Sequence, residues 1–423
     1  MSDRFEALMV DQINVKDKRV FVRVDFNVPL DKKGNIRDNA RIAKASPTIR
    51  HILKKGAKSV VLASHLGRPN GQRNAKFSLK QILSEVEKSI GTKVTFLNDC
   101  VGPEVEEACR DPKPGTVFLL ENLRFHVAEQ GKGKNKQGKK IKATKAEKKD
   151  FRASLTKLAD IYVNDAFGTC HRAHSSMVGI GLPIKAAGFL IKKELRAFGS
   201  VLDRPRRPFV AVLGGKKVHD KLPLIKNLLN LVDEVVISGG MAWTFLHVLG
   251  MKIGKSILDK EGAKLVPEIL KLAKKKDVRI HLPTDAVAAE RFDKDSATKI
   301  VKSEEGIPDG WMGLDIGPAT AQEFANRIKY AQTVVYNGPQ GVFEMPAFEK
   351  GTIACLEAMA FATLDYGATT IVGGGDSASA AKIFGFDALV THTSTGGGAS
   401  LELLQGKVLP GIEILTTGVK SKL

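Results

Sequence analysis

Long apolar runs and paired cysteines are both missing from this chain of 423 residues. No apolar stretch approaches the roughly 18 residues that a membrane-spanning helix needs, so we expect no membrane partner. The four cysteines, at positions 100, 109, 170 and 355, have no Cys-x-x-Cys spacing. This pattern argues against structural zinc and disulfides and favours a reducing compartment. The first six residues also lack the apolar region of a secretory signal.

Aromatic residues are scarce, at 6%, although the formal net charge is +20. Nine lysines fall between Gly131 and Asp150, with no aromatic side chain among them for base stacking. We interpret this run as a solvated, mobile surface loop, with a nucleic-acid patch as the alternative, and expect no nucleic-acid partner. The remaining positive charge would speed the encounter with polyanionic metabolites.

Short apolar runs alternate with amphipathic segments along the whole chain, which is typical of βαβ units and a parallel sheet. The length favours two large domains. In the first half we expect strands at 20–24, 60–62, 94–97, 117–120 and 161–163, and helices at 42–54, 79–90 and 150–158. In the second half we expect strands at 209–213, 235–237, 278–282, 334–336, 371–372 and 389–391, and helices at 222–231, 242–248 and 265–275. A longer helix is expected over 187–203, where Pro205 and Pro208 break the chain, and we place the domain junction there.

Cationic side chains follow several of the expected strands in the first half. Arg41, Arg68, Arg124 and Arg172 each come after a different strand, and His65 ends one of them. Because the carboxyl ends of parallel strands meet at one rim of a sheet, we expect these side chains to converge. Guanidinium groups match carboxylate and phosphate oxygens bidentately, so the pattern predicts a small, multiply anionic substrate.

Glycine pairs or triples end three strands of the second half, at 214–215, 239–240 and 373–375. Glycine lets backbone N–H groups approach phosphates closely, so we interpret this border as a nucleotide site. Asp376 stands where a carboxylate would hold Mg²⁺ against phosphate oxygens, and Lys217 and Lys221 suit phosphate neutralisation. A tight packing turn and a solvated helix start are the alternatives.

The standard nucleotide motifs are not matched. Gly179-x-Gly181 lacks the later glycine of a dinucleotide fingerprint, which argues against the rival class of NAD-linked dehydrogenases. A basic nucleic-acid or scaffold protein is the non-catalytic rival; it would explain the charge but would not require the arginines.

Several longer motifs together resemble the phosphoglycerate kinase family. They lie at 22–29 (Val-Arg-Val-Asp-Phe-Asn-Val-Pro), 64–69, 121–125, 164–169, 338–344, 373–376 and 394–402, and so span nearly the whole chain. The resemblance implies an α/β fold with two Rossmann-like, doubly wound parallel-sheet domains. It assigns 1–186 to a 3-phosphoglycerate domain, 187–203 to a hinge helix, 204–405 to a nucleotide domain, and 406–423 to a segment that returns to the first domain.

The same resemblance implies an activity: reversible, Mg²⁺-dependent transfer of a phosphoryl group between 1,3-bisphosphoglycerate and ADP, giving 3-phosphoglycerate and ATP. It places the triose on Asp25, Asn27, Arg41, His65, Arg68, Arg124 and Arg172. It places the nucleotide on Gly215, Lys217, Lys221, Gly239, Gly313, Leu314, Asn337, Pro339, Glu344, Gly373, Gly374, Gly375, Asp376 and Ser377.

Within this set we assign stabilisation of transition-state charge to Arg41, Lys217, Gly374 and Gly375, and the metal to Asp376. The chain has Lys216 where the family usually has Ala, which puts an extra cation near the expected nucleotide, and we expect a shift in nucleotide affinity. Ser377 replaces a frequent Thr and keeps the hydroxyl.

The sequence ends in Ser421-Lys422-Leu423, which matches a peroxisomal address. We expect a peroxisome-type organelle (a glycosome), reached through an import receptor, with the cytoplasm as the alternative. No feature demands an oligomer, so we expect a monomer.

Overall fold

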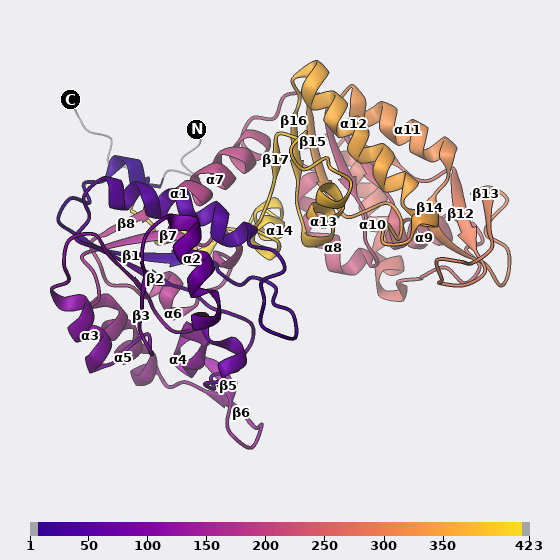
Figure 1. Cartoon of the computed structure of the whole chain (residues 1–423). Coiled ribbons are helices and arrows are strands. Elements are labelled where there is room, and N and C mark those ends of the chain that lie inside the picture. The colour runs from indigo at the N-terminus through magenta and orange to yellow at the C-terminus, as the bar shows by residue number, and fades with distance from the viewer. Residues whose placement is uncertain (1–6, 417–423) are drawn as a thin grey trace. The chain divides into compact units, whose positions relative to one another are not determined.

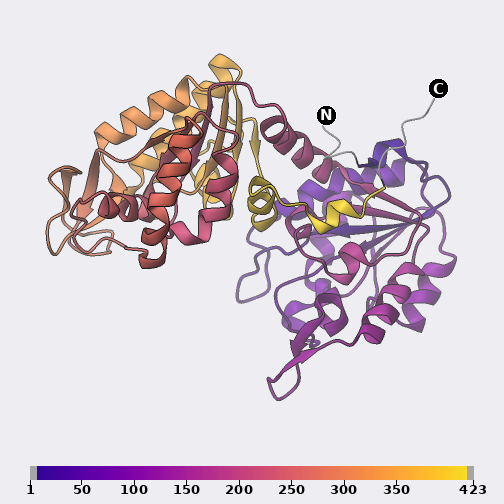
Figure 2. The same ribbon diagram turned by 180° about the vertical axis from the view of Figure 1, so that it is seen from behind.

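The computed structural model describes residues 7–416, which divide into two compact units (Figures 1 and 2). Within that range, unit 1 contains 7–195 and 408–416, and unit 2 contains Arg196–Lys407. The division falls inside helix α7 (Phe189–Leu202). Ser421–Leu423, the expected organelle signal, lies outside the described residues. No helix in the described range combines the length and apolar character needed to cross a membrane.

Unit 1 is built on six parallel strands in the order β3-β4-β2-β1-β7-β8. Its strands are β1 (Arg19–Val24), β2 (Ser59–Ala63), β3 (Thr95–Phe96), β4 (Thr116–Leu119), β7 (Ile161–Asp165) and β8 (Ile184–Ala187), with a separate hairpin of β5 (Lys132–Lys134) and β6 (Lys140–Lys142). Its helices are α1 (Ala40–Lys54), α2 (Leu83–Ile90), α3 (Pro103–Arg110), α4 (Val127–Gln130), α5 (Lys145–Thr156), α6 (Ser175–Val178), the first part of α7, and α15 (Pro410–Glu413).

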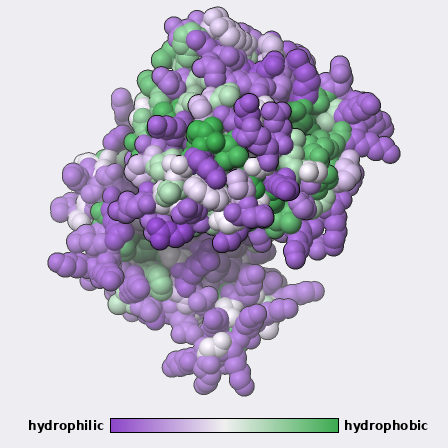
Figure 3. Space-filling model, turned by 90° about the vertical axis from the view of Figure 1, so that its right-hand side faces the viewer, coloured by the Kyte–Doolittle hydropathy of each residue, from purple (hydrophilic) through white to green (hydrophobic). Residues whose placement is uncertain are grey.

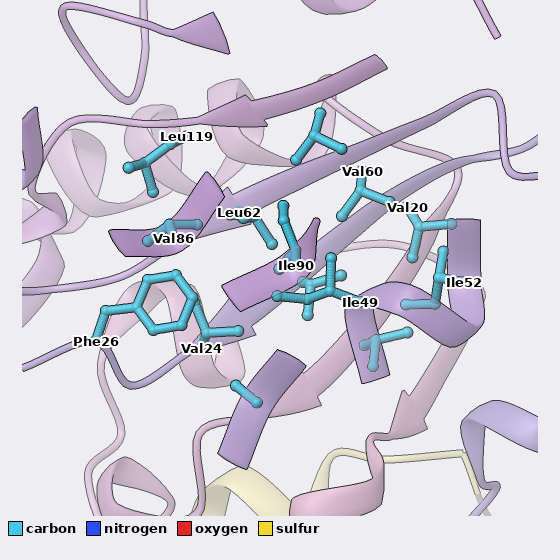
Figure 4. Close-up of a cluster of buried hydrophobic side chains, with 14 of the residues drawn as sticks. Val20, Val24, Phe26, Ile49, Ile52, Val60, Leu62, Val86, Ile90 and Leu119 are labelled. Atoms are coloured by element: carbon cyan, nitrogen blue, oxygen red, sulfur yellow. The ribbon is translucent and has the colours of Figure 1, made fainter. Parts of the chain in front are cut away.

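The core of unit 1 forms because its central strands are apolar on both faces. All five residues of β2 are buried, as a parallel strand covered by helices on both sides requires. Figure 4 shows the face on which strand side chains meet α1 and α2. The labelled members of this cluster are Val20, Val24, Phe26, Ile49, Ile52, Val60, Leu62, Val86, Ile90 and Leu119.

Unit 2 repeats the plan with six parallel strands in the order β11-β10-β9-β15-β16-β17 and adds a three-stranded antiparallel sheet, β13-β12-β14. Its strands are β9 (Phe209–Leu213), β10 (Glu234–Ile237), β11 (Arg279–His281), β12 (Asp285–Ala289), β13 (Thr298–Lys302), β14 (Met312–Ile316), β15 (Thr333–Asn337), β16 (Thr369–Val372) and β17 (His392–Thr393). Its helices are the rest of α7, α8 (Val218–Leu228), α9 (Gly239–Val248), α10 (Lys260–Lys275), α11 (Pro318–Lys329), α12 (Lys350–Tyr366), α13 (Gly375–Ile383) and α14 (Gly398–Leu404).

Both parallel sheets reverse their strand order next to the first strand of the unit. In unit 2 the six strands run 3-2-1-4-5-6 in their own sequence order, which is the Rossmann arrangement. In unit 1 they run 3-4-2-1-5-6. The reversal lies between β1 and β7 in unit 1 and between β9 and β15 in unit 2, and ligands of such sheets bind at the carboxyl ends of these strands. The predicted fold class, two doubly wound parallel-sheet domains, is confirmed.

Three local predictions are wrong. The segment expected as one helix at 79–90 is a 3-10 turn (Leu79–Ile82) followed by α2, and the Leu79 N–H at its start donates to the Glu121 carboxylate. The strand expected at 389–391 lies slightly later, as β17. The lysine run is exposed, as expected, but it is not an irregular loop: it forms the β5–β6 hairpin and the first turn of α5.

The face shown in Figure 3 is mostly hydrophilic, with apolar patches interrupted by polar side chains.

Candidate active site

The predicted triose residues of unit 1 gather at one end of four neighbouring strands, β4, β2, β1 and β7. Asp25 and Asn27 follow β1, Arg124 lies in the turn after β4, and Arg172 follows β7. His65 and Arg68 follow β2, and Arg41 is in the first turn of α1. All seven residues therefore lie at the carboxyl rim next to the reversal of strand order.

Direct contacts join several of these residues. An Arg41 guanidinium nitrogen lies 2.5 Å from the Asp25 Oδ2 atom. The Gly67 N–H donates to the Asn27 Oδ1 atom at 2.8 Å, and Arg124 donates to the carbonyl oxygen of Gly67 at 2.9 Å. Arg68 and Arg172 are exposed at the same rim and have no ion pair with a described carboxylate. Their guanidinium groups are thus available to an anionic ligand.

A buried network of hydrogen-bonded polar side chains lies beneath this rim, and the sequence analysis did not predict it. Arg23, fully buried in β1, donates from Nε to the Ser176 Oγ atom at 2.9 Å and lies 3.3 Å from the His65 Nδ1 atom. Glu129 in α4 is buried and accepts both the Ser176 N–H (2.9 Å) and the Ser176 hydroxyl (2.6 Å). These side-chain contacts therefore connect Glu129 through Ser176 and Arg23 to His65. The one available sequence signal was an arginine inside an apolar strand, since a buried cation needs partners.

The protonation states at the rim follow from burial and from the crowding of cations. Burial, with Arg124 and Arg23 nearby, lowers the pKa of His174 to about 3, and burial also lowers the pKa of His65 well below its usual range. Burial lowers the pKa of Arg124 to about 10. Burial opposes ionisation of Asp25, but the neighbouring positive charges outweigh it and lower its pKa. At neutral pH the positive charge is therefore carried by the arginines, while the two histidines are neutral.

The rim of unit 2 is formed mainly by backbone. Gly214 and Gly215 follow β9, Gly239 begins α9 directly after β10, Asn337 ends β15, and Gly373–Gly375 lead from β16 into α13. A Cβ atom on Gly214 would lie 2.1 Å from the Pro339 carbonyl oxygen, so only glycine allows these two turns to pack. Gly374 has φ +96°, a conformation that other residues rarely adopt.

Side chains then tie the glycine turns together. Lys221 Nζ donates to both the carbonyl oxygen (2.7 Å) and the Oδ1 atom (2.6 Å) of Asn337. Asn337 in turn donates from Nδ2 to the Gly373 carbonyl oxygen at 2.9 Å, and the Ser377 hydroxyl accepts the Gly338 N–H at 2.7 Å. Burial lowers the pKa of Lys221 to about 8, and Asp376 opposes this shift.

Asp376 meets the requirements of a magnesium ligand. It is exposed in the first turn of α13, beside the glycine turn, and forms no ion pair with a described cation. Mg²⁺ is commonly held by one or two carboxylates together with substrate phosphates, and Asp376 is a single accessible carboxylate beside a glycine turn. A different group with metal-ligand spacing, Asp99, Cys100 and His126, is occupied internally, since His126 Nε2 lies 2.7 Å from Asp99 Oδ1 and burial raises the pKa of the Cys100 thiol.

Not all predicted nucleotide residues lie on this turn. Lys217 is exposed at the N-cap of α8, close in sequence to Gly215, and the extra cation Lys216 is exposed beside it. Gly313 and Leu314 belong to β14 in the antiparallel sheet, and Glu344 is exposed in the loop after β15. The Leu314 carbonyl oxygen accepts the Val342 N–H at 2.9 Å, which links that strand to the loop carrying Glu344. These three residues form a second group, beside the Lys221–Asn337–Gly373 cluster.

Known proteins share both the sequence and this architecture. The sequence model described as phosphoglycerate kinase matches residues 10–407. The chain belongs to the phosphoglycerate kinase family. It is 58% identical to the "Probable phosphoglycerate kinase" of Caenorhabditis elegans and 56% identical to the phosphoglycerate kinase of Schistosoma mansoni, each over 97% of this chain and 98% of the relative.

The solved phosphoglycerate kinase structure from Coxiella burnetii matches with a TM-score of 0.83 and 35% identity, over 96% of this chain and 98% of that one. Membership in the phosphoglycerate kinase family makes this chain a kinase, a phosphotransferase, and the resemblance seen in its motifs is confirmed.

Proposed function

We propose that this enzyme transfers a phosphoryl group reversibly between the acyl phosphate of 1,3-bisphosphoglycerate and ADP, as in glycolysis. The observation that carries the proposal is the chemical contrast of the two rims: four arginines around a small polar site in unit 1, and glycine turns with Lys221 and Asp376 in unit 2. The first suits a small anion with a carboxylate and a phosphate, and the second suits the phosphates of a nucleotide.

The nucleophile needs no general base in this reaction. The carboxylate of 3-phosphoglycerate is ionised at neutral pH, so catalysis consists of positioning and of stabilising the charge on the phosphoryl group in flight. We assign that stabilisation to Arg41, Lys217 and the N–H groups of Gly374 and Gly375. Lys221 anchors a phosphate, and Asp376 would hold Mg²⁺, which supplies charge neutralisation on the phosphate oxygens when bound.

The two substrates are assigned to different units, so transfer requires their rims to face each other while water is excluded from the acyl phosphate. We place the hinge for this step at α7, which contains the division between the units and is followed by Pro205 and Pro208. A monomer suffices for this scheme, because each proposed residue comes from one chain.

The test is a coupled assay with ADP and 1,3-bisphosphoglycerate, with Mg²⁺ present or removed by a chelator. We expect ATP formation that depends on Mg²⁺. Titration of the same protein with 3-phosphoglycerate should protect unit 1 in hydrogen exchange, and titration with ADP should protect unit 2. Absence of ATP formation, or protection of the opposite unit by each ligand, would contradict the proposal.

A further inference from the structure

The hairpin of β5 and β6 carries most of the lysine run outward from unit 1 (Figures 1 and 2). Lys132 pairs with Lys142, and Lys134 pairs with Lys140. Directly opposed residues of an antiparallel pair point to the same face, so all four lysines share one face of the hairpin. Each of the four is exposed, and none forms an ion pair with a described carboxylate.

The opposite face holds the hairpin on the body of unit 1. A Cβ atom on Gly133 would lie 2.4 Å from the Asn70 carbonyl oxygen and 3.2 Å from a Val127 methyl group. Ile141, its partner across the hairpin, is half-buried. The Lys134 N–H donates to the Asn70 carbonyl oxygen, and Gln72 donates to the Lys134 carbonyl oxygen, so residues 70–72 cover the outer edge of β5 at Lys134.

The hydrogen-bond pattern fixes which backbone groups face outward. The Ala143 N–H donates to Gly131 (3.1 Å) and the Asn135 N–H to Lys139 (2.9 Å), at the two ends of the ribbon. Bonded and non-bonded pairs alternate in an antiparallel ribbon, so both lysine pairs occupy non-bonded positions. At these positions side chains approach most closely and backbone groups point away from the partner strand. On the β6 edge, the backbone N–H and C=O groups of Lys140 and Lys142 have no hydrogen-bond partner within residues 7–416.

The opposed lysines repel each other, and protection of the sheet edge does not by itself explain why they are placed in this way. Like charges directly opposite one another destabilise a strand pair. Lysines do blunt exposed sheet edges, but residues 70–72 already cover the β5 edge at Lys134, so this lysine has no edge to protect. An anionic partner would neutralise both pairs at once.

We propose that the free edge of β6 binds an extended acidic segment of a partner protein as a third strand. Alternate side chains of an extended peptide repeat at about 6.6 Å, the same spacing as Lys140 and Lys142, so carboxylates at every second position meet these lysines. The outward N–H and C=O groups supply the main-chain hydrogen bonds. The absence of aromatic residues from the run disfavours a single-stranded nucleic acid, which binds through base stacking.

Further cations lie beyond the hairpin for a longer segment. Lys145, Lys148, Lys149 and Arg152 of α5 line a hollow of about 680 Å³. The lowest part of Figure 3, where the hairpin projects, is correspondingly hydrophilic.

The experiment measures binding of a labelled peptide of alternating Glu and Thr to the full chain by fluorescence anisotropy. Two variants separate charge from backbone. Lys142→Thr removes one ion pair and should weaken binding roughly two- to fivefold. Lys142→Pro removes the same charge and also the outward N–H, without touching a bond of the hairpin, and should weaken binding about tenfold more than Lys142→Thr. Catalytic activity should be unchanged in both, because the hairpin contains no residue of the proposed active site.

Controls define the outcomes. Lys149→Thr, which removes a charge from α5 but not from the edge, should match Lys142→Thr or have a smaller effect. Amide exchange at Lys142 should slow when the peptide binds. Equal losses for Lys142→Thr and Lys142→Pro, or equally tight binding of a peptide with its glutamates clustered at one end, would overturn strand addition. Tighter binding of inorganic polyphosphate or duplex DNA, with no difference between the two Lys142 variants, would overturn it in favour of an unspecific polyanion site.

Discussion

The candidate sites of the two units lie at the same point of the same kind of sheet but are built from different chemical groups. Unit 1 presents charged side chains, such as Arg41, on the segments that follow four strands, whereas unit 2 presents backbone at glycine turns and only a few side chains, such as Lys221. A small substrate offers few atoms, so recognition must come from converging charges. A nucleotide offers phosphates that backbone N–H groups can reach only where no Cβ intervenes. Topology thus fixes where a site lies, and local residue type fixes what it binds.

The largest expected effect is on kcat. It comes from removing the cationic side chain that each rim is proposed to place at the transition state. Arg41→Ala and Lys217→Ala should each lower kcat by about 10³-fold, because stabilising donors at the transferring group have effects of this size. Steady-state kinetics of both variants, with melting temperature as a check on folding, measure the effect. Arg68→Ala is the matched variant in unit 1 and should mainly raise the triose KM. A near-normal kcat for either alanine variant would remove that residue from the mechanism.

A methyl group added to Gly374 should damage the rim of unit 2, which is formed mainly by backbone. In Gly374→Ala the new Cβ would lie 3.1 Å from the Asn337 Nδ2 atom, at a residue with φ +96°. We expect the nucleotide KM to rise roughly 30-fold, since displacement of Asn337 costs about 2 kcal/mol and also loosens Lys221. Gly385→Ala is the control: its φ is +78° and a Cβ there meets nothing within 4 Å, so it carries the strain without the contact. Equal KM changes in both variants would show that strain alone is responsible.

Much of the parallel architecture could be predicted from the sequence because its strands are buried on both faces. The expected strand at 209–213 matches β9, whose five residues are all buried. The antiparallel sheet of unit 2 was not predicted. Its central strand β12 reads Asp-Ala-Val-Ala-Ala, and its neighbour β13 is almost wholly exposed, so neither shows the apolar pattern of a strand.

The site divides in a similar way. The rim residues follow strand ends, and their position could therefore be predicted from the order of strands. The buried network of polar side chains beneath these residues could not be predicted in this way. Glu129 and Ser176 lie on helices of four residues each, 47 positions apart in sequence, and only the packing of those helices joins them. The functional roles of all these residues stay predictions.

The pH dependence should distinguish the lysine of one rim from the arginines of the other. Lys221, with a pKa lowered to about 8 by burial, is charged at neutral pH and loses its proton as the pH rises through that value. The nucleotide KM should therefore increase several-fold from about pH 7 to about pH 9. The triose KM should stay nearly constant, because even Arg124, whose pKa falls to about 10, remains mostly charged. Lys221→Arg should flatten the nucleotide profile; a profile unchanged by this substitution would assign the titration to another group.

Substitutions in the buried polar network of unit 1 should have the smallest effect on catalysis, but they should have a measurable effect on stability. Glu129→Gln keeps the shape of the side chain and removes the negative charge that faces buried Arg23 across Ser176. An uncompensated buried cation destabilises the fold, and we expect Tm to fall by about 5 °C with kcat nearly unchanged. A multivalent anion such as sulfate should restore more stability to this variant than to the parent chain, because a ligand bound at the arginines replaces the missing charge. Glu147→Gln, at the exposed capping box of α5, controls for loss of a carboxylate in general and should shift Tm much less. An anion that stabilises parent and Glu129→Gln equally would show that Glu129 holds the fold without acting as the counter-charge of the arginine rim.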